Sequence, residues 1–87
     1  MYLHLGKNVI VPFDTVIGVF DLDSASASAR TRAYLERAEK AGRLIPVTDD
    51  VPRSFVVCRE GGADTVYLSQ ISARTLERRA GIFLNEP

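Results

Sequence analysis

Few side chains of this chain could do covalent or acid–base chemistry. It has one histidine, His4, and one cysteine, Cys58. His4 stands between Leu3 and Leu5 in an extended apolar run, so its ring is expected on the opposite face of a strand from the leucines. Arg59 would lower the pKa of the Cys58 thiol only if both side chains pointed the same way, and adjacent strand residues do not. We therefore expect a structural or solvated histidine and an inert, buried thiol.

Two pairs of carboxylates are the other residues with possible chemistry, Asp21 with Asp23 and Asp49 with Asp50. Such pairs can hold a divalent cation, but no glycine-bearing loop of the calcium-binding type accompanies either pair. Turn formation and the attraction of acids to a helix N-terminus explain both pairs. Because the sequence also has no nucleophile-elbow, P-loop or dinucleotide-binding motif, we predict a protein that is not an enzyme and that holds no metal, cofactor or small-molecule ligand.

Arginine is the residue type that points to a partner. Nine of the eleven basic residues are arginine, whose planar side chain pairs with phosphate and carboxylate groups. Three of them crowd the C-terminal part of the chain, and Arg74 and Arg78 share one helical face, where like charges destabilise an isolated helix. Attraction to the C-terminal helix dipole would explain Arg78 and Arg79 but explains Arg74 poorly. Contact with a phosphate or an acidic surface is the other interpretation.

The length of the chain limits how stable it can be alone. Eighty-seven residues form one domain, residues 1–87, and a domain of this size buries only about 60–65% of the surface that its unfolded chain exposes. One cysteine forms no intrachain disulfide, and no cluster of Cys and His is present for a structural metal. We therefore expect a homo-oligomer, since association of folded copies stabilises the folded state.

Charge and hydropathy restrict the partners and the location. Eleven basic and eleven acidic residues give a formal net charge of zero, so only a local concentration of cations could attract a nucleic acid. No apolar run approaches the roughly 20 residues that span a bilayer, and the N-terminal residues do not resemble a signal peptide. A single cysteine fits a reducing compartment. The sequence predicts a cytoplasmic protein with no membrane partner.

The hydrophobic pattern predicts the elements that must position these residues. Alternating apolar runs predict short strands, two of them joined by Gly6 and Lys7 and two by the linker REGGAD. The strands are expected at residues 2–5, 8–11, 16–22, 43–47, 54–58 and 65–71. Helical spacing predicts a main helix from about residue 28 to 41, with Ser24, Ser26 or Ser28 as its cap, and a short C-terminal helix that begins after Ser72 and ends at Gly81. This order predicts an α+β fold with a mostly antiparallel sheet of about five to six strands.

Two segments carry further expectations. The run at residues 16–22 is apolar on both faces, which predicts a strand covered on two sides by its own domain or by a neighbouring subunit. Gly18 in that run allows a close approach to the backbone. Residues 82–87 are expected to pack on the body of the domain or on a neighbour.

Several segments, taken in order, resemble a known family. They are YLHLGKNVIV, VIGVFDLDS, a helix ending in AEKAGRL, RSFVVC and TVYLSQISARTLERR. Their succession is similar to that of the bacterial RemA and RemB regulators of extracellular matrix and biofilm formation, and is closest to the RemB branch. The resemblance spans residues 2–79. It implies a small cytoplasmic DNA-binding transcriptional regulator that assembles into closed rings and activates genes for matrix production or osmoprotection.

The resemblance also implies which residues contact DNA. In RemA-type members the turn before the fifth strand carries adjacent arginines, and another arginine precedes the third strand. Here that turn reads DVPR at residues 50–53, and the earlier position is Thr15. Arg53 is therefore the first DNA-binding candidate, although Asp49 and Asp50 would repel phosphate and either could form an ion pair with Arg53.

Arg74, Arg78 and Arg79 are the next DNA-binding candidates. The competing hypothesis is an oligomeric protein-binding or scaffolding module that does not bind DNA, which the balanced charge favours. A third hypothesis, sensing of a small ligand in a cleft between subunits, rests only on Gly18 and the Ser–Ala segment at residues 24–29.

Overall fold

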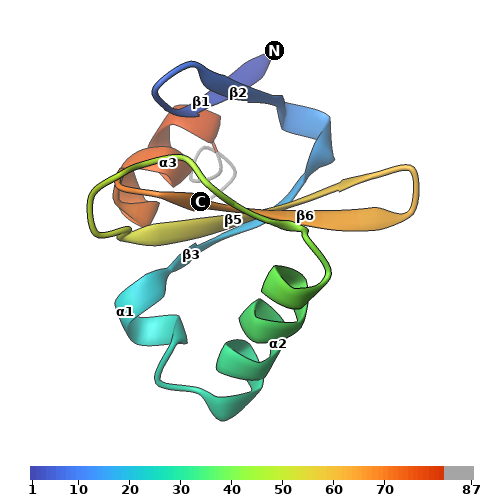
Figure 1. Cartoon of the computed structure of the whole chain (residues 1–87). Helices are drawn as coiled ribbons and strands as arrows, with labels where there is room; N and C mark the ends of the chain where they lie inside the picture. The colour runs from blue at the N-terminus through green and yellow to red at the C-terminus, as the bar shows by residue number, and fades with distance from the viewer. Residues whose placement is uncertain (82–87) are drawn as a thin grey trace, which may run out of the picture.

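The computed structural model describes residues 1–81, which form three layers (Figure 1). The middle layer is a four-stranded sheet with the spatial order β3 (Val16–Asp21), β5 (Ser54–Glu60), β6 (Ala63–Ser69) and β4 (Leu44–Pro46). Above it in Figure 1 lie a hairpin and a helix, namely β1 (Tyr2–Gly6), β2 (Val9–Pro12) and α3 (Ala73–Ala80). Below it lie α1 (Leu22–Ala25) and α2 (Ala29–Lys40). A short 3-10 turn, η1 (Phe13–Thr15), joins the hairpin to β3.

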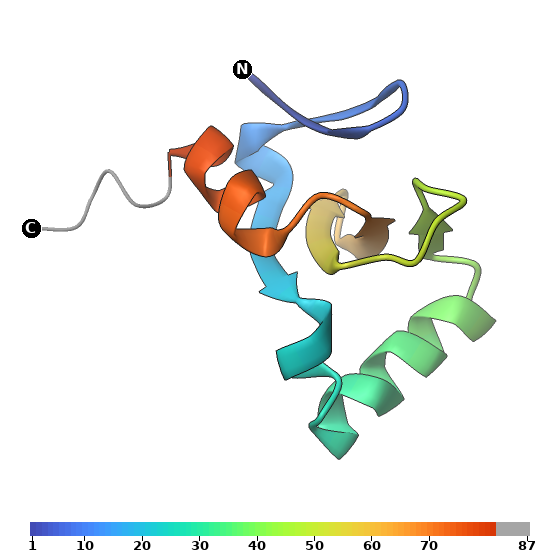
Figure 2. The same ribbon diagram turned by 90° about the vertical axis from the view of Figure 1, so that its left-hand side faces the viewer.

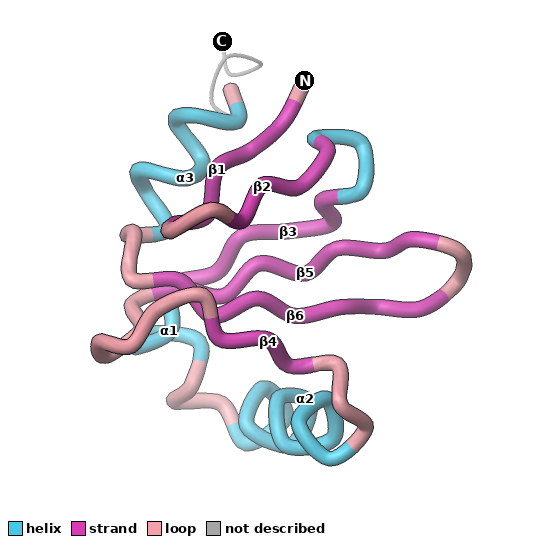
Figure 3. Tube along the Cα trace, turned by 45° about the horizontal axis from the view of Figure 1, so that its top comes forward, coloured by secondary structure: helices cyan, strands magenta, loops and turns pink. Residues whose placement is uncertain are grey.

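The strand directions differ from the prediction in one respect. The α+β class, the six strands, the main helix and the short C-terminal helix are confirmed. A single, mostly antiparallel sheet was the wrong expectation, because β1 and β2 form a sheet of their own and the larger sheet is mixed (Figure 3). In that sheet β5 is antiparallel to both β3 and β6, whereas β4 is parallel to β6. The reason is the α2 crossover, which returns the chain so that β4 runs in the same direction as β3.

The upper core lies between the hairpin, α3 and the sheet. Leu3, Leu5 and Val11 alternate with exposed residues and point at the sheet, where they meet Val56 and, from α3, Leu76. All five are buried. Their alternation at every second residue explains why one side of the hairpin is covered.

Two buried serines fasten this layer to the sheet. The Ser69 hydroxyl donates to the carbonyl oxygen of Leu5 at 2.6 Å and accepts from the Ile71 amide at 3.0 Å. The Ser54 hydroxyl donates to the carbonyl oxygen of Ile71 at 2.7 Å. Buried polar groups are costly unless they are hydrogen-bonded, so these bonds hold the hairpin and the turn before α3 in fixed positions.

The lower core is smaller and one-sided. Ala38 of α2 is completely buried against the sheet, where it forms a cluster with Phe55, Val57 and Val66. An alanine at the contact lets the helix approach the sheet closely. Among the described residues, the members of this cluster come from α1, α2, β4, β5 and β6, and none comes from β3. The lower face of β3 is therefore left partly open.

The helix starts agree with the capping prediction in part. Ser28 caps α2 and Ser72 caps α3, each accepting from the backbone N–H three residues on. Strand β3 ends at Asp21, one residue earlier than predicted. The Asp21 carboxylate accepts a hydrogen bond from the Ser24 amide at 3.0 Å and so caps α1, a single helical turn. The sequence did not predict this turn. The predicted packing of residues 82–87 lies outside the described residues. No helix within residues 1–81 is long and apolar enough to cross a membrane.

Candidate functional site

Arg53 stands at the end of the loop that leads into β5, and its side chain is exposed. Its backbone is held on two sides: the N–H donates to the carbonyl oxygen of Ser69 at 2.8 Å, and the carbonyl oxygen accepts from the Leu22 amide at 3.0 Å. The guanidinium group is thus displayed from a fixed backbone, which reduces the conformational entropy that a contact with a partner would cost.

The other three arginines are exposed on α3. Arg74 is in the first turn, whereas Arg78 and Arg79 are in the last turn, next to the carbonyl groups at the C-terminus of the helix. Attraction between those two cations and the helix dipole stabilises that end. Arg74 stands at the N-terminal end, where the dipole disfavours a cation, so the dipole gives no reason for its position.

The two segments that carry the four arginines, the loop before β5 and α3, lie on the same side of the molecule. The loop before β5, α1 and α3 all face the viewer in Figure 2. Ser54, the residue after Arg53, is hydrogen-bonded to Ile71 in the turn that leads to α3. We call the surface formed by Arg53, Arg74, Arg78 and Arg79 the arginine side. None of the four takes part in an ion pair within residues 1–81.

One of the two carboxylates near Arg53 is engaged elsewhere. Asp49 accepts a hydrogen bond from Lys7 at 2.8 Å, and this ion pair lowers the pKa of the Asp49 carboxyl below its usual value. Asp50 uses its backbone N–H to bond the Thr48 hydroxyl at 3.0 Å, which is the turn role that the sequence predicts. The alternative in which Arg53 forms an ion pair with Asp49 or Asp50 is not realised among the described residues.

His4 and Cys58, the residues with possible catalytic chemistry, both have structural roles. The Nε2 atom of His4 lies 2.8 Å from the carbonyl oxygen of Lys7 in the hairpin turn. Cys58 is buried in the upper core, and burial raises the pKa of its thiol, which keeps it protonated at neutral pH. Residues 1–81 contain no group of three or more His, Cys, Asp or Glu side chains that could hold a metal ion.

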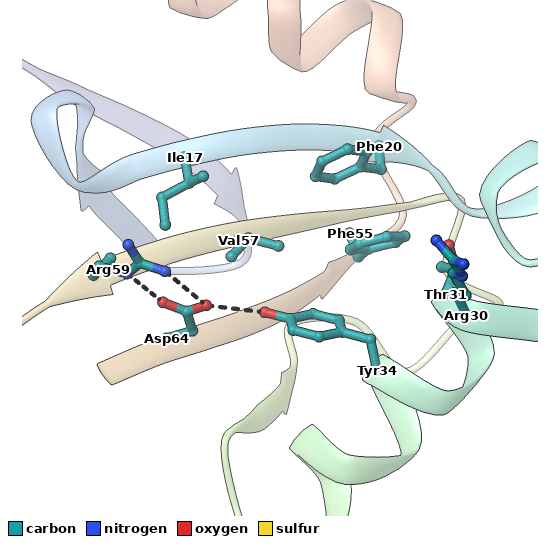
Figure 4. A pocket seen from close by; sticks show the side chains of 9 residues that line it. All are labelled: Ile17, Phe20, Arg30, Thr31, Tyr34, Phe55, Val57, Arg59 and Asp64. Atoms are coloured by element: carbon teal, nitrogen blue, oxygen red, sulfur yellow. Dashed lines mark hydrogen bonds and ion pairs between the residues drawn. The ribbon is translucent and has the colours of Figure 1, made fainter. Parts of the chain in front are cut away.

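A second candidate surface, which the sequence did not predict, is an open groove under β3 and β5 (Figure 4). Its volume is about 360 Å³. The floor is apolar, and a charged pair closes one end. The lining residues are Ile17, Phe20, Arg30, Thr31, Tyr34, Phe55, Val57, Arg59 and Asp64. We call this surface the β3 groove.

Its floor is shaped by a bulge in β3. Val16 lies opposite Cys58 and Gly18 lies opposite Val57, so Ile17 is an extra residue with no counterpart in β5. The bulge turns Ile17 into the β3 groove. The rings of Phe20 and Phe55 stack there with centroids 5.0 Å apart.

Gly18 makes this arrangement possible. A Cβ atom at Gly18 would lie 2.7 Å from the ring of Phe20, so the close approach predicted at this glycine is made by its own chain. The domain itself does not cover β3 on both sides, because 53% of Ile17 and 42% of Phe20 remain exposed. Cover by a neighbouring subunit, the other alternative, stays a prediction. In the sequence, the apolar residues on both faces of the run at residues 16–22 were the signal for the β3 groove. They did not show which face of the strand stays open.

The charged end of the β3 groove is held by hydrogen bonds. The Nε atom of Arg59 donates to Asp64 at 2.7 Å, and the Tyr34 hydroxyl donates to the same carboxylate at 3.3 Å. Arg43 donates to the Asp64 carbonyl oxygen at 2.8 Å. The Arg59 hydrogen bond lowers the pKa of Asp64, and burial, followed by the charge of Asp64, raises the pKa of Tyr34.

The lowered pKa of Asp64 predicts an acid-sensitive contribution to stability. The ionised carboxylate stabilises the folded state above the unfolded-state pKa of about 3.9, and this contribution is lost as the pH falls through the lower folded-state value. Asp64→Asn is therefore expected to lower the urea midpoint at pH 7 and to have a smaller effect near pH 2. Glu36→Gln, which removes the exposed ion pair with Lys40, is the control and should change the midpoint little at either pH. An Asp64→Asn effect that is equal at both pH values would contradict the prediction.

Comparison with known proteins identifies the family. Residues 2–80 match the RemA-like family, described as extracellular matrix regulatory protein A-like. The chain is also 30% identical over 80 residues to extracellular matrix regulatory protein B of Bacillus subtilis strain 168, an alignment that covers 92% of this chain and 90% of that protein. These matches confirm the resemblance drawn from the ordered segments. The chain belongs to the RemA-like family of extracellular matrix regulatory proteins.

Proposed function

We propose that this protein is a DNA-binding transcriptional regulator of extracellular matrix and biofilm genes that acts in the cytoplasm as a homo-oligomer. The observation that carries the proposal is the arginine side, where four exposed arginines stand on two segments that lie on the same side of the molecule. None of the four takes part in an ion pair within residues 1–81. The B. subtilis relative is an extracellular matrix regulatory protein, which supports the choice of target genes.

The chemistry of the arginine side suits a phosphate backbone. A guanidinium group binds phosphate through two parallel hydrogen bonds and carries its charge at any physiological pH. The Lys7–Asp49 ion pair neutralises one of the two acids near Arg53, which lowers the repulsion that a phosphate would meet there. Repetition of the surface in an oligomer multiplies the small number of cations per chain, which compensates for a net charge of zero.

Salt-dependent binding tests this function. Fluorescence anisotropy would follow the intact protein with a labelled promoter duplex between 50 and 200 mM salt. If cations of the arginine side contact phosphates, the affinity should fall by about 3.5-fold per contact over this range, because each neutralised phosphate releases a counterion. Failure to bind any duplex at 50 mM salt would overturn the proposal. It would favour the protein-binding or scaffolding module that the balanced charge also fits.

A further inference from the structure

A second apolar surface is exposed on the far side of the molecule from the β3 groove. In the hairpin, Tyr2 lies opposite Pro12 and Ile10 lies opposite His4, so these side chains point away from the core-facing Leu3, Leu5 and Val11. The exposed fractions are 90% for Met1, 63% for Tyr2 and 55% for Ile10. We call Tyr2 and Ile10, which share the outer face of the hairpin, the hairpin face. Contiguous exposed apolar groups of this kind mark interaction surfaces.

The positions of the two surfaces are suited to a head-to-tail contact. The hairpin is the uppermost layer in Figure 1, whereas the β3 groove opens under the sheet toward α2. One surface is the outer face of a projecting ribbon and the other is hollow. Their rims also differ in charge: Arg30 is exposed at the groove, and Asp14 is exposed in η1, next to the residue whose N–H donates to the carbonyl oxygen of Met1. Neither of them takes part in an ion pair within the described part of the chain.

The polar groups of the β3 groove argue against a small ligand as its occupant. Ligand sites place a few free polar groups at fixed positions around an apolar body. Here Arg59, Asp64 and Tyr34 are hydrogen-bonded to one another, which leaves Arg30 as the charged group free to recognise a ligand among the described lining residues. The bulge at Ile17 also disfavours addition of a further strand to the edge of β3.

We propose that the β3 groove of one copy receives the hairpin face of the next copy. The inference rests on the self-association in the proposed function and names its two surfaces. Since the two surfaces are different, each copy keeps one free hairpin face and one free groove until a ring closes. The contact would cover the lower face of β3, which one chain leaves open.

Complementation between two variants tests this contact. Ile17→Glu places a charge in the groove and Ile10→Glu places one on the hairpin face; both residues are largely exposed, so the fold should tolerate either change. Size-exclusion chromatography with light scattering should give a single chain of 9.6 kDa for each variant alone. An equimolar mixture should give a species of about twice that mass, because one intact groove can still meet one intact hairpin face. Ile45→Glu, on β4 outside both surfaces, should assemble as the unmodified protein does.

Three other results would overturn the proposed contact between the β3 groove and the hairpin face. Each of them leaves DNA binding to be tested separately. A monomeric unmodified protein would exclude any self-contact, while Arg53-dependent DNA binding could still be measured by anisotropy. An Ile17→Glu variant that stays oligomeric would move the interface elsewhere and leave the regulator intact. Two monomeric variants that do not complement each other would indicate a symmetric contact. Circular dichroism of each variant shows whether loss of assembly follows from loss of the fold, and a second pair, Ile17→Ser with Ile10→Ser, repeats the test with smaller changes.

Discussion

Arg53→Ala is expected to weaken DNA binding at 0.1 M salt by about eightfold for every subunit whose Arg53 reaches a phosphate, because each such contact contributes a counterion-release factor of that size. Two contacting subunits would lose about 60-fold together. The slope of log affinity against log salt should become shallower by about 0.9 per lost contact. Anisotropy titrations at four salt concentrations measure both quantities.

Two variants give the control for this prediction. Arg37→Ala removes the same charge from α2, which lies under the sheet and away from the arginine side, so it should leave the affinity and the slope nearly unchanged. Arg53→Lys keeps the charge and should keep the slope, while losing the two-pronged geometry. An equal loss for Arg37→Ala and Arg53→Ala would mean that only the overall charge matters, and Arg53 would no longer be a specific contact.

Leu76→Ala is expected to have the largest effect on folding. Leu76 is completely buried and joins α3 to the hairpin residues and to Val56 of the sheet. Truncation of a leucine in such a position costs about 2–5 kcal/mol through lost burial and the cavity left behind. A domain of this length has a free energy of unfolding of roughly 4–13 kcal/mol, so a large part of its stability would be lost. Urea unfolding followed by circular dichroism measures the change.

The matched variant for Leu76→Ala is Leu76→Met, which conserves the volume and should cost less than about 1.5 kcal/mol. Both should be compared at one protein concentration, since the proposed self-association would add to the apparent stability. A loss below about 1 kcal/mol for Leu76→Ala would contradict the packing role of α3. Such a result would appear as a Leu76→Ala variant with the wild-type circular dichroism spectrum and almost the wild-type urea midpoint.

The secondary structure follows closely from the local pattern. Ser28 and Ser72 mark the starts of α2 and α3 in the sequence. Gly81, in the left-handed conformation at φ 73°, ends α3. These signals are local, because a cap depends on the residues within one helical turn. The pairing of strands is not local. The parallel register of Leu44 with Val66 depends on where the α2 crossover returns the chain, and no residue in β4 encodes that direction.

In the candidate site, too, the local features could be predicted from the sequence and the long-range contacts could not. The exposed position of Arg53 in a turn follows from its neighbours Asp50 and Pro52, and membership of the family was evident from the ordered segments. The partner of Asp49 was missed, because Lys7 is 42 residues away in the sequence. The β3 groove was missed for a related reason: it depends on a bulge that shifts Ile17 and on the place where α2 stops covering the sheet.

The hydrogen bond between Ser69 and Leu5 has a consequence for how the chain acquires its fold. It joins residues 64 positions apart, and the hairpin that it fastens also packs on α3, near the other end of the described chain. During synthesis Leu3 and Leu5 therefore remain without their full cover until α3 has left the ribosome. Nascent chains that stop before α3 should accordingly be rapidly degraded, and completion of the upper core should be the slow, late step of folding.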